Sequence, residues 1–282
     1  MSVTQPADET PTAPEHGPRG ERAQDTTVGE VELTRWHTRI GHWMASFARW
    51  LADTVGPYGT LLLTLAIGAA IAGLLSVAAV LVYDAVTDQD GVAGIDRPLL
   101  DAILTIRNPA VDPYITSFTD LAGTIGMPLV AIAALLILSI RRRSWTPVVL
   151  IVAAGGGSLL MTIAGKVLIG RERPPLSDAV PPYEVSASFP SGHTLNAVAI
   201  LGVIAYLLVL RRQSNAARAA IIAVAVIATI FVAGSRVYLG HHWVTDVIAG
   251  WALGAAWLAL VITAHRLYLT SRLRRDEHRA VA

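Results

Sequence analysis

The chain contains no cysteine, which excludes disulfides, thiolate metal sites and cysteine nucleophiles. Charge is scarce as well: Asp, Glu, Lys and Arg make up 15% of the 282 residues, whereas 53% are hydrophobic. A soluble domain of this length needs more charge to cover its surface, so the composition favours a membrane protein. The formal net charge of +1 argues against a polyanionic partner such as nucleic acid.

The N-terminal region lacks an apolar core, so we expect no cleaved signal peptide and expect membrane insertion to rely on internal segments. Residues 1–30 are rich in Pro, Thr, Glu, Asp and Gly, which predicts a disordered tail. In residues 31–55, large apolar side chains recur at three- and four-residue steps with arginines between them. This pattern predicts an amphipathic helix, which either lies on the membrane surface or docks on its own bundle.

Six apolar stretches free of Asp, Glu, Lys and Arg follow. They cover residues 58–83, 121–140, 144–165, 193–210, 219–235 and 247–264. A helix that crosses the hydrocarbon core needs roughly 17–25 mostly apolar residues, and all six stretches fit that range. We therefore predict an all-α, polytopic membrane protein, with a six-helix transmembrane domain over residues 56–268 and a basic tail over 269–282.

The orientation of this bundle follows from its arginines. They gather between the second and third spans, between the fourth and fifth spans, and after the sixth: Arg141, Arg142, Arg143, Arg211, Arg212, Arg218, Arg266, Arg272, Arg274, Arg275 and Arg279. Cytoplasmic loops of membrane proteins carry an excess of positive charge, so this side and both termini are expected in the cytoplasm. A loop over residues 84–120 and the segments 166–192 and 236–246 then face the extracytoplasmic side of the cell membrane.

Three short segments at span boundaries on that outer side carry residues that suggest chemistry. They hold four cations and three of the eight histidines: Lys166, Arg171, Arg173, His193, Arg236, His241 and His242. A single cation at a span end is usually a membrane anchor. A cluster outside, against the charge bias, indicates a functional site. Because guanidinium groups match phosphate oxygens two at a time, the cluster favours a phosphate ligand.

The same segments contain a possible nucleophile. His242 and Asp246 are four residues apart, so on a helix they share a face and the carboxylate can orient the imidazole for attack. Ser191 and Gly192 begin the fourth span, where free backbone amides attract an anion. Each feature has a plainer interpretation, as a structural His–Asp pair or as a turn and helix cap. Their joint presence on one side of the membrane is what those interpretations do not explain.

The order Lys-x6-Arg-Pro, Pro-Ser-Gly-His and Ser-Arg-x5-His-x3-Asp resembles the type 2 phosphatidic acid phosphatase superfamily, which includes bacterial lipid phosphatases, glucose-6-phosphatase and vanadium-dependent haloperoxidases. Every motif position is filled: Lys166, Arg173, Pro174, Pro190, Ser191, Gly192, His193, Ser235, Arg236, His242 and Asp246. The resemblance covers the chain from the third span onward, with weaker likeness upstream, and leaves the first 50 residues outside.

The resemblance implies a role for each motif residue. His242 would attack phosphorus and form a phosphohistidine, Asp246 would orient it, and His193 would protonate the leaving oxygen. The phosphate would be bound by Lys166, Arg173, Ser191, Gly192 and Arg236. Because these cations and backbone amides neutralise the charge on the phosphate, the resemblance implies no metal and no cofactor. His241 duplicates the histidine, but only His242 keeps the four-residue step to Asp246.

The expected function is an integral membrane lipid phosphatase with a lipid phosphate as its substrate. An outward-facing site suits recycling of a prenyl diphosphate carrier, as an undecaprenyl diphosphatase does, so we rank that substrate first. Phosphatidic acid and phosphatidylglycerophosphate are the alternatives. An anion or lipid transporter is the non-enzyme alternative, disfavoured because the histidine motifs are not repeated. A haloperoxidase is disfavoured because those relatives are soluble.

Overall fold

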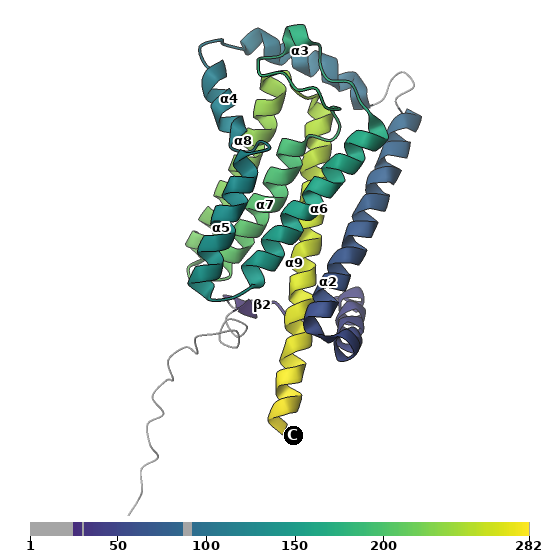
Figure 1. The fold of residues 1–282 in the computed structure, drawn as a ribbon, viewed down its shortest axis with the longest axis vertical. Helices are drawn as coiled ribbons and strands as arrows, with labels where there is room; N and C mark the ends of the chain where they lie inside the picture. The colour runs from purple at the N-terminus through teal and green to yellow at the C-terminus, as the bar shows by residue number, and fades with distance from the viewer. Residues whose placement is uncertain (1–24, 30, 87–91, 282) are drawn as a thin grey trace, which may run out of the picture.

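The computed structural model describes residues 25–29, 31–86 and 92–281, and their backbone is predominantly helical (Figure 1). One small hairpin pairs β1 (Thr27–Val28) antiparallel with β2 (Val31–Glu32). Most of the expected disordered tail, residues 1–24, lies outside the described residues. The hairpin occupies the start of the segment 31–55 that the sequence predicted to be helical, so the helix there begins later than expected.

α2 (Arg39–Val86) is two helices joined at a kink. Gly56 lies at the junction with φ +79° and ψ 165°, a conformation that only glycine adopts readily. The part before the kink buries Ala45 and Ala48 against Leu267 of the last helix, α9 (Val244–Val281). Its other face exposes large apolar side chains: Ile40, Trp43, Phe47 and Trp50. The helix therefore docks on the bundle along one face and leaves an aromatic face uncovered.

The segment 84–120 is not the loop that the sequence predicted. Its described part contains a 3-10 turn η1 (Val92–Ile95) and two short helices, α3 (Asp96–Ile106) and α4 (Asp112–Asp120). α3 lies across the end of the bundle (Figure 1). Short helices with acidic first turns escape a search for long uncharged stretches, because their stability comes from tertiary packing and not from length or apolarity.

Beside α2, the bundle contains α5 (Gly126–Arg142), α6 (Thr146–Ile169), α7 (Gly192–Val209), α8 (Asn215–Tyr238) and α9 (Val244–Val281). Four described helical segments are long and apolar enough to cross a membrane, namely α6, α7, α8 and Val244–Arg272 of α9. These coincide with four of the expected spans. The other two fall on α2, whose apolar described run is Gly59–Gly68, and on the 17-residue α5.

α7 is the central helix, packed against α6, α8 and α9 (Figure 1). One of its faces is fully buried and carries Leu195, Ala199, Val203 and Leu207 at four-residue steps. α6 and α9 also approach closely, because a Cβ on Gly157 would lie 2.1 Å from Cζ2 of Trp257. The Trp257 indole donates to the carbonyls of Ala153 and Ala154, both at 3.2 Å. The last turns of α6 and α8 and the first turns of α7 and α9 therefore lie together at one end of the bundle.

Candidate active site

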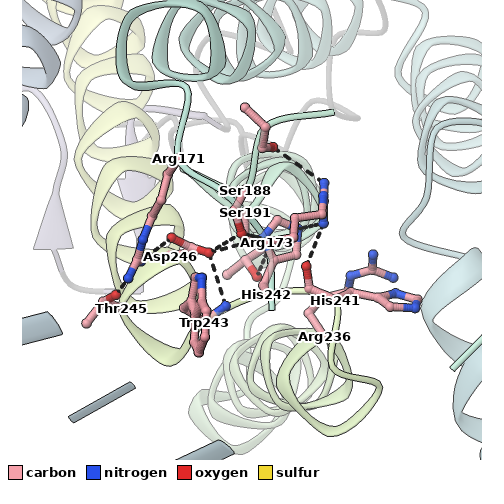
Figure 2. A network of polar contacts seen from close by, with 12 residues as sticks. Arg171, Arg173, Ser188, Ser191, Arg236, His241, His242, Trp243, Thr245 and Asp246 are labelled. Atoms are coloured by element: carbon pink, nitrogen blue, oxygen red, sulfur yellow. Dashed lines mark hydrogen bonds and ion pairs between the residues drawn. The ribbon is translucent and has the colours of Figure 1, made fainter. Parts of the chain in front are cut away.

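The three motif segments meet at that end, beneath α3 (Figures 1 and 2). The first follows α6, the second leads into α7, and the third connects α8 to α9. The third makes a sharp turn at Gly240, whose φ is +69°. A Cβ at Gly240 would lie 2.3 Å from the carbonyl oxygen of Asp178, so only glycine fits there.

This turn changes how His242 meets Asp246. His242 lies before α9, which begins at Val244, so the two residues are not on one helix as the sequence predicted. Their side chains still meet across the helix N-terminus, with Nδ1 of His242 3.5 Å from Oδ2 of Asp246. The same carboxylate oxygen accepts a hydrogen bond from the backbone N–H of Trp243 at 3.1 Å. Both side chains are buried.

Ser188 joins this pair, and the motifs did not reveal it. Its hydroxyl donates to Oδ2 of Asp246 at 2.5 Å and lies 3.3 Å from Nδ1 of His242. Ser188 is fully buried and comes just before the Pro-Ser-Gly-His motif. The imidazole of His242 is therefore oriented by a carboxylate and a hydroxyl together.

The hydrogen bonds fix the tautomer of His242. Nη1 of Arg173 lies 3.2 Å from Nε2 of His242. A guanidinium only donates, so Nε2 must accept and the ring proton must be on Nδ1, toward Ser188 and Asp246. Burial lowers the pKa of His242 to about 4, although Asp246 acts in the opposite direction. The ring is therefore neutral near pH 7, and its lone pair faces the cations (Figure 2).

The three expected phosphate-binding cations lie within electrostatic range of one another, and Arg173 is the one that contacts Nε2 of His242. Arg236 is 2% exposed, and its Nε has no hydrogen-bond partner among the described residues. Nη1 of Arg173 donates to the carbonyl of His241 at 2.6 Å, and its Nε donates to that of Ser186 at 2.7 Å. Nζ of Lys166 donates to Oγ of Ser186 at 3.1 Å and to the carbonyl of Ala187. Oxygens of the segment between α6 and α7 thus cover the cation cluster.

Glu184 belongs to that segment and was missed by the sequence motifs. One carboxylate oxygen accepts from Arg236, and the other accepts from Nη2 of Arg173 at 3.0 Å. Burial alone would raise the pKa of Glu184, but Arg236 and Arg173 overcome this and lower it to about 2. Nδ1 of His193, on the first turn of α7, lies 4.0 Å from this carboxylate. The structure therefore has an anion bound between two arginines and beside His193.

Ser191 and Gly192 lie at the start of α7 but are engaged in packing. The backbone N–H of Ser191 donates to the carbonyl of Asp246 at 3.1 Å, so this expected phosphate donor is committed to α9 here. A Cβ on Gly192 would lie 2.9 Å from Cγ2 of Thr162. The close approach of α6 and α7 is therefore sufficient to explain the glycine.

The ring of His241 has a backbone carbonyl as its hydrogen-bond partner, although Arg236 lies close enough to act on its charge. Its Nε2 lies 2.6 Å from the carbonyl of Val180, to which it donates, and its own carbonyl accepts from Arg173. Burial lowers the pKa of His241, so the ring is neutral. Of the adjacent histidines, only His242 has a ring nitrogen within hydrogen-bond distance of a cation among the described residues.

Comparisons with known proteins identify the family of the chain. The PAP2 superfamily matches residues 145–268. Phosphatidylglycerophosphatase B of Bacillus subtilis is 35% identical over 184 residues, which are 64% of this chain and 88% of that protein. The crystal structure of a transmembrane PAP2-type phosphatidylglycerolphosphate phosphatase from Bacillus subtilis matches with a TM-score of 0.60 and 29% identity, over 67% of this chain and 93% of that one. The chain therefore belongs to the PAP2 superfamily, as its motifs indicated, and is a membrane phosphoester hydrolase that acts on lipid phosphates.

Proposed function

We propose that this chain removes the terminal phosphate of phosphatidylglycerophosphate. The names of the two Bacillus subtilis relatives support this substrate. The prenyl diphosphate that we ranked first from the sequence has no such support. Phosphatidylglycerophosphate, one of the two alternatives, fits better. Phosphatidic acid, which presents the same monoester, is the second candidate. Membership of a phosphatase family removes the transporter alternative.

The observation that carries the proposal is the bound carboxylate of Glu184. It stands in for a phosphate group, because a carboxylate offers the same anionic oxygens to the two guanidinium groups. The Arg173 guanidinium that binds this carboxylate also donates to Nε2 of His242. Nδ1 of His193 lies 4.0 Å from the other carboxylate oxygen, the one that Arg236 binds. A phosphate at this position has a neutral imidazole lone pair and a second imidazole within reach.

The first chemical step transfers the phosphoryl group to the protein. Nε2 of His242 attacks phosphorus, and the bond from phosphorus to the lipid oxygen breaks. His193 gives its proton to that oxygen, so the lipid leaves as an alcohol. Asp246 and Ser188 hold the Nδ1 proton of His242 and stabilise the positive charge that the ring acquires.

The second step regenerates the protein. His193, now neutral, takes a proton from water as the water oxygen attacks phosphorus, and the bond from phosphorus to Nε2 breaks. Lys166, Arg173 and Arg236 bind the three equatorial oxygens in both steps. We also assign Gly192 to the phosphate site, where the N-terminus of α7 favours an anion, and Ser191 joins it there only by giving up its bond to the carbonyl of Asp246. The mechanism needs no metal ion.

We place the site at the extracytoplasmic face of a six-span bundle. The arginine-rich connections α5–α6 and α7–α8 lie at the end of the bundle opposite the site, and such connections are typical of the cytoplasmic side (Figure 1). The uncovered aromatic face of the first part of α2 lies near that end, and we propose that it rests in the membrane interface. A reporter fused at Arg212 is then cytoplasmic, and one fused near Pro181 is external.

A substrate panel tests the proposal. Phosphate release is measured in detergent micelles from phosphatidylglycerophosphate, phosphatidic acid and a prenyl diphosphate at equal surface concentrations, with His242→Ala as the blank. We expect the highest kcat/KM for phosphatidylglycerophosphate. A prenyl diphosphate preferred by tenfold or more would overturn the substrate assignment while leaving the phosphatase chemistry intact.

A further inference from the structure

Asp246 has a second ionic partner on the side away from His242. Nη1 of Arg171 donates to its Oδ1 at 2.6 Å, whereas the nearest His242 nitrogen lies beside Oδ2. Nη2 of Arg171 donates to Oδ2 of Asp96, also at 2.6 Å. Arg171 therefore bridges two carboxylates, one in the catalytic segment and one at the start of α3.

Asp96 is itself held firmly. It is 3% exposed, and its Oδ1 accepts from the backbone N–H of Thr245 at 2.9 Å. Its Oδ2 accepts from the hydroxyl of Thr245 at 2.6 Å as well as from Arg171. Arg171 also donates to the same hydroxyl at 2.7 Å and lies over the Trp243 ring, 5.6 Å from its centroid. The guanidinium is thus fixed on several sides.

This arrangement separates Arg171 from the phosphate-binding cations with which the sequence grouped it. Figure 2 shows Arg171 on the far side of Asp246 from Arg173 and Arg236. Its guanidinium donates to the two carboxylates and to Thr245, whereas Arg173 and Arg236 share Glu184. A role in binding the phosphate therefore does not fit its position.

We propose that Arg171, anchored by Asp96, is a positioning residue that holds the Asp246 carboxylate in place behind His242. The inference rests on the proposed role of His242 as nucleophile. Asp246 orients His242 only if its own carboxylate cannot rotate, and one bond from Arg171 to Oδ1 prevents that rotation while Oδ2 serves Ser188 and His242. A carboxylate shared between two rigid partners keeps the imidazole in its attacking geometry.

The charges give this arrangement a measurable signature. The charged and titratable groups that act on His242 are the cations Arg173 and Arg236, the anions Glu184 and Asp246, and the ring of His193. Arg171 adds a positive charge behind Asp246, and Asp96 partly cancels it. Removing Arg171 favours protonation of the His242–Asp246 pair, so the acid limb of kcat/KM moves to higher pH. Removing the charge of Asp96 moves that limb to lower pH.

The experiment measures steady-state kinetics and pH profiles for purified full-length Arg171→Gln, Arg171→Lys and Asp96→Asn. We expect kcat of Arg171→Gln to fall on the order of 100-fold with KM little changed, because the nucleophile is misplaced while the phosphate clamp is intact. Arg171→Lys keeps the charge and should recover part of the loss. The two acid limbs should move in opposite directions, which a purely structural role does not produce. The ionisation of the substrate is common to all variants and cancels in the comparison.

Arg97→Gln is the matched control, because Arg97 follows Asp96 on helix α3. Its side chain is exposed in its ion pairs with Asp101 and Asp178. A kcat within about twofold of the wild type for both Arg171→Gln and Asp96→Asn, a difference worth only about 0.4 kcal/mol, would overturn the inference. Acid limbs that move together or not at all would overturn it too. If Arg171→Gln does not fold, Arg171→Lys and Asp96→Asn decide. Trapping of an acid-labile phosphoenzyme in the wild type tests the proposed function separately.

Discussion

Glu184 and Arg236 form an ion pair at the proposed phosphate site. The buried guanidinium keeps Nε unpaired in the described structure while Nη2 is bound to the carboxylate. A substrate phosphate must therefore displace Glu184 before it meets both arginines.

Replacing Glu184 by glutamine should tighten the binding of phosphate mimics. A hydrogen bond between charged groups contributes about 1.5–3 kcal/mol, so loss of the competing charge should lower the inhibition constant of vanadate on the order of tenfold. Because the pKa of Glu184 is held at about 2, this competition should be constant above about pH 3. Glu172→Gln, on the exposed side of the same segment, is the control. Weaker vanadate inhibition in Glu184→Gln would show that the carboxylate assists binding.

The two histidines should differ in their response to an activated substrate. His242→Ala should abolish turnover and any acid-labile phosphoenzyme. His193→Ala should be severely impaired on a lipid phosphate, because the leaving alkoxide needs a proton. With p-nitrophenyl phosphate the leaving group needs little protonation, so turnover by His193→Ala should be partly restored, whereas His242→Ala should stay inactive.

His241→Ala provides the control for that experiment. Its ring binds the carbonyl of Val180 and not the cations, so the variant should retain much of the wild-type activity. An inactive His241→Ala beside an active His242→Ala would move the nucleophile to the neighbouring residue.

The cations should separate into two classes by their effect on turnover. Arg173→Ala and Arg236→Ala should each lower kcat on the order of 100-fold or more, because a preorganised donor to the transition state is lost. Arg141→Ala, exposed at the opposite end of the bundle, should leave kcat unchanged. Arg142 is not a suitable control, since it contacts Asp25 and the carbonyl of Leu207. Equal losses at Arg141 and Arg236 would show that all of these arginines serve folding.

The pH dependence of the free enzyme should reflect the buried nucleophile. The pKa of His242 is lowered from its ordinary value to about 4, so the ring stays neutral and able to attack down to that pH. We expect the acid limb of kcat/KM, corrected for the ionisation of the substrate, near pH 4 and not near 6.5. The same depression means that stability gained from a neutral His242 is present above about pH 6.5 and is lost as the pH falls toward 4. A limb near 6.5 would show that the ring is protonated as easily as in water.

The sequence predicted the parts of the site that follow each other closely in the chain. Lys166 and Arg173 bracket the end of α6, and His242 and Asp246 bracket the start of α9, so short motifs were sufficient to find them. The helix assumed for the second pair was wrong, because the turn at Gly240 delays α9 until Val244. Four of the expected spans coincide with helices long and apolar enough to cross a membrane, because a long uncharged stretch has few other structures open to it there.

The remaining residues could not be predicted because their partners are distant in sequence. Asp96 meets Arg171 from 75 residues away and Thr245 from 149 residues away, and no local pattern records such contacts. Glu184 and Ser188 lie in a segment without periodicity, where a carboxylate or hydroxyl is ordinarily a surface residue. Only the path of the chain between α6 and α7 brings them to the cations.

The contact between Gly157 and Trp257 has a consequence far from the headgroups. α6 carries Lys166 at its end, α9 begins beside His242, and midway along both helices a flat indole rests on bare backbone. The rigid indole sets the distance between α6 and α9, and no flexible side chain at this contact can adjust to a larger residue at position 157. A single methyl group added at Gly157 must push the helices apart or displace the ring, so the gap between the clamp and the nucleophile widens. A substitution deep among the lipid tails is thereby expected to stop phosphate chemistry at the surface, in a protein that is still folded and inserted.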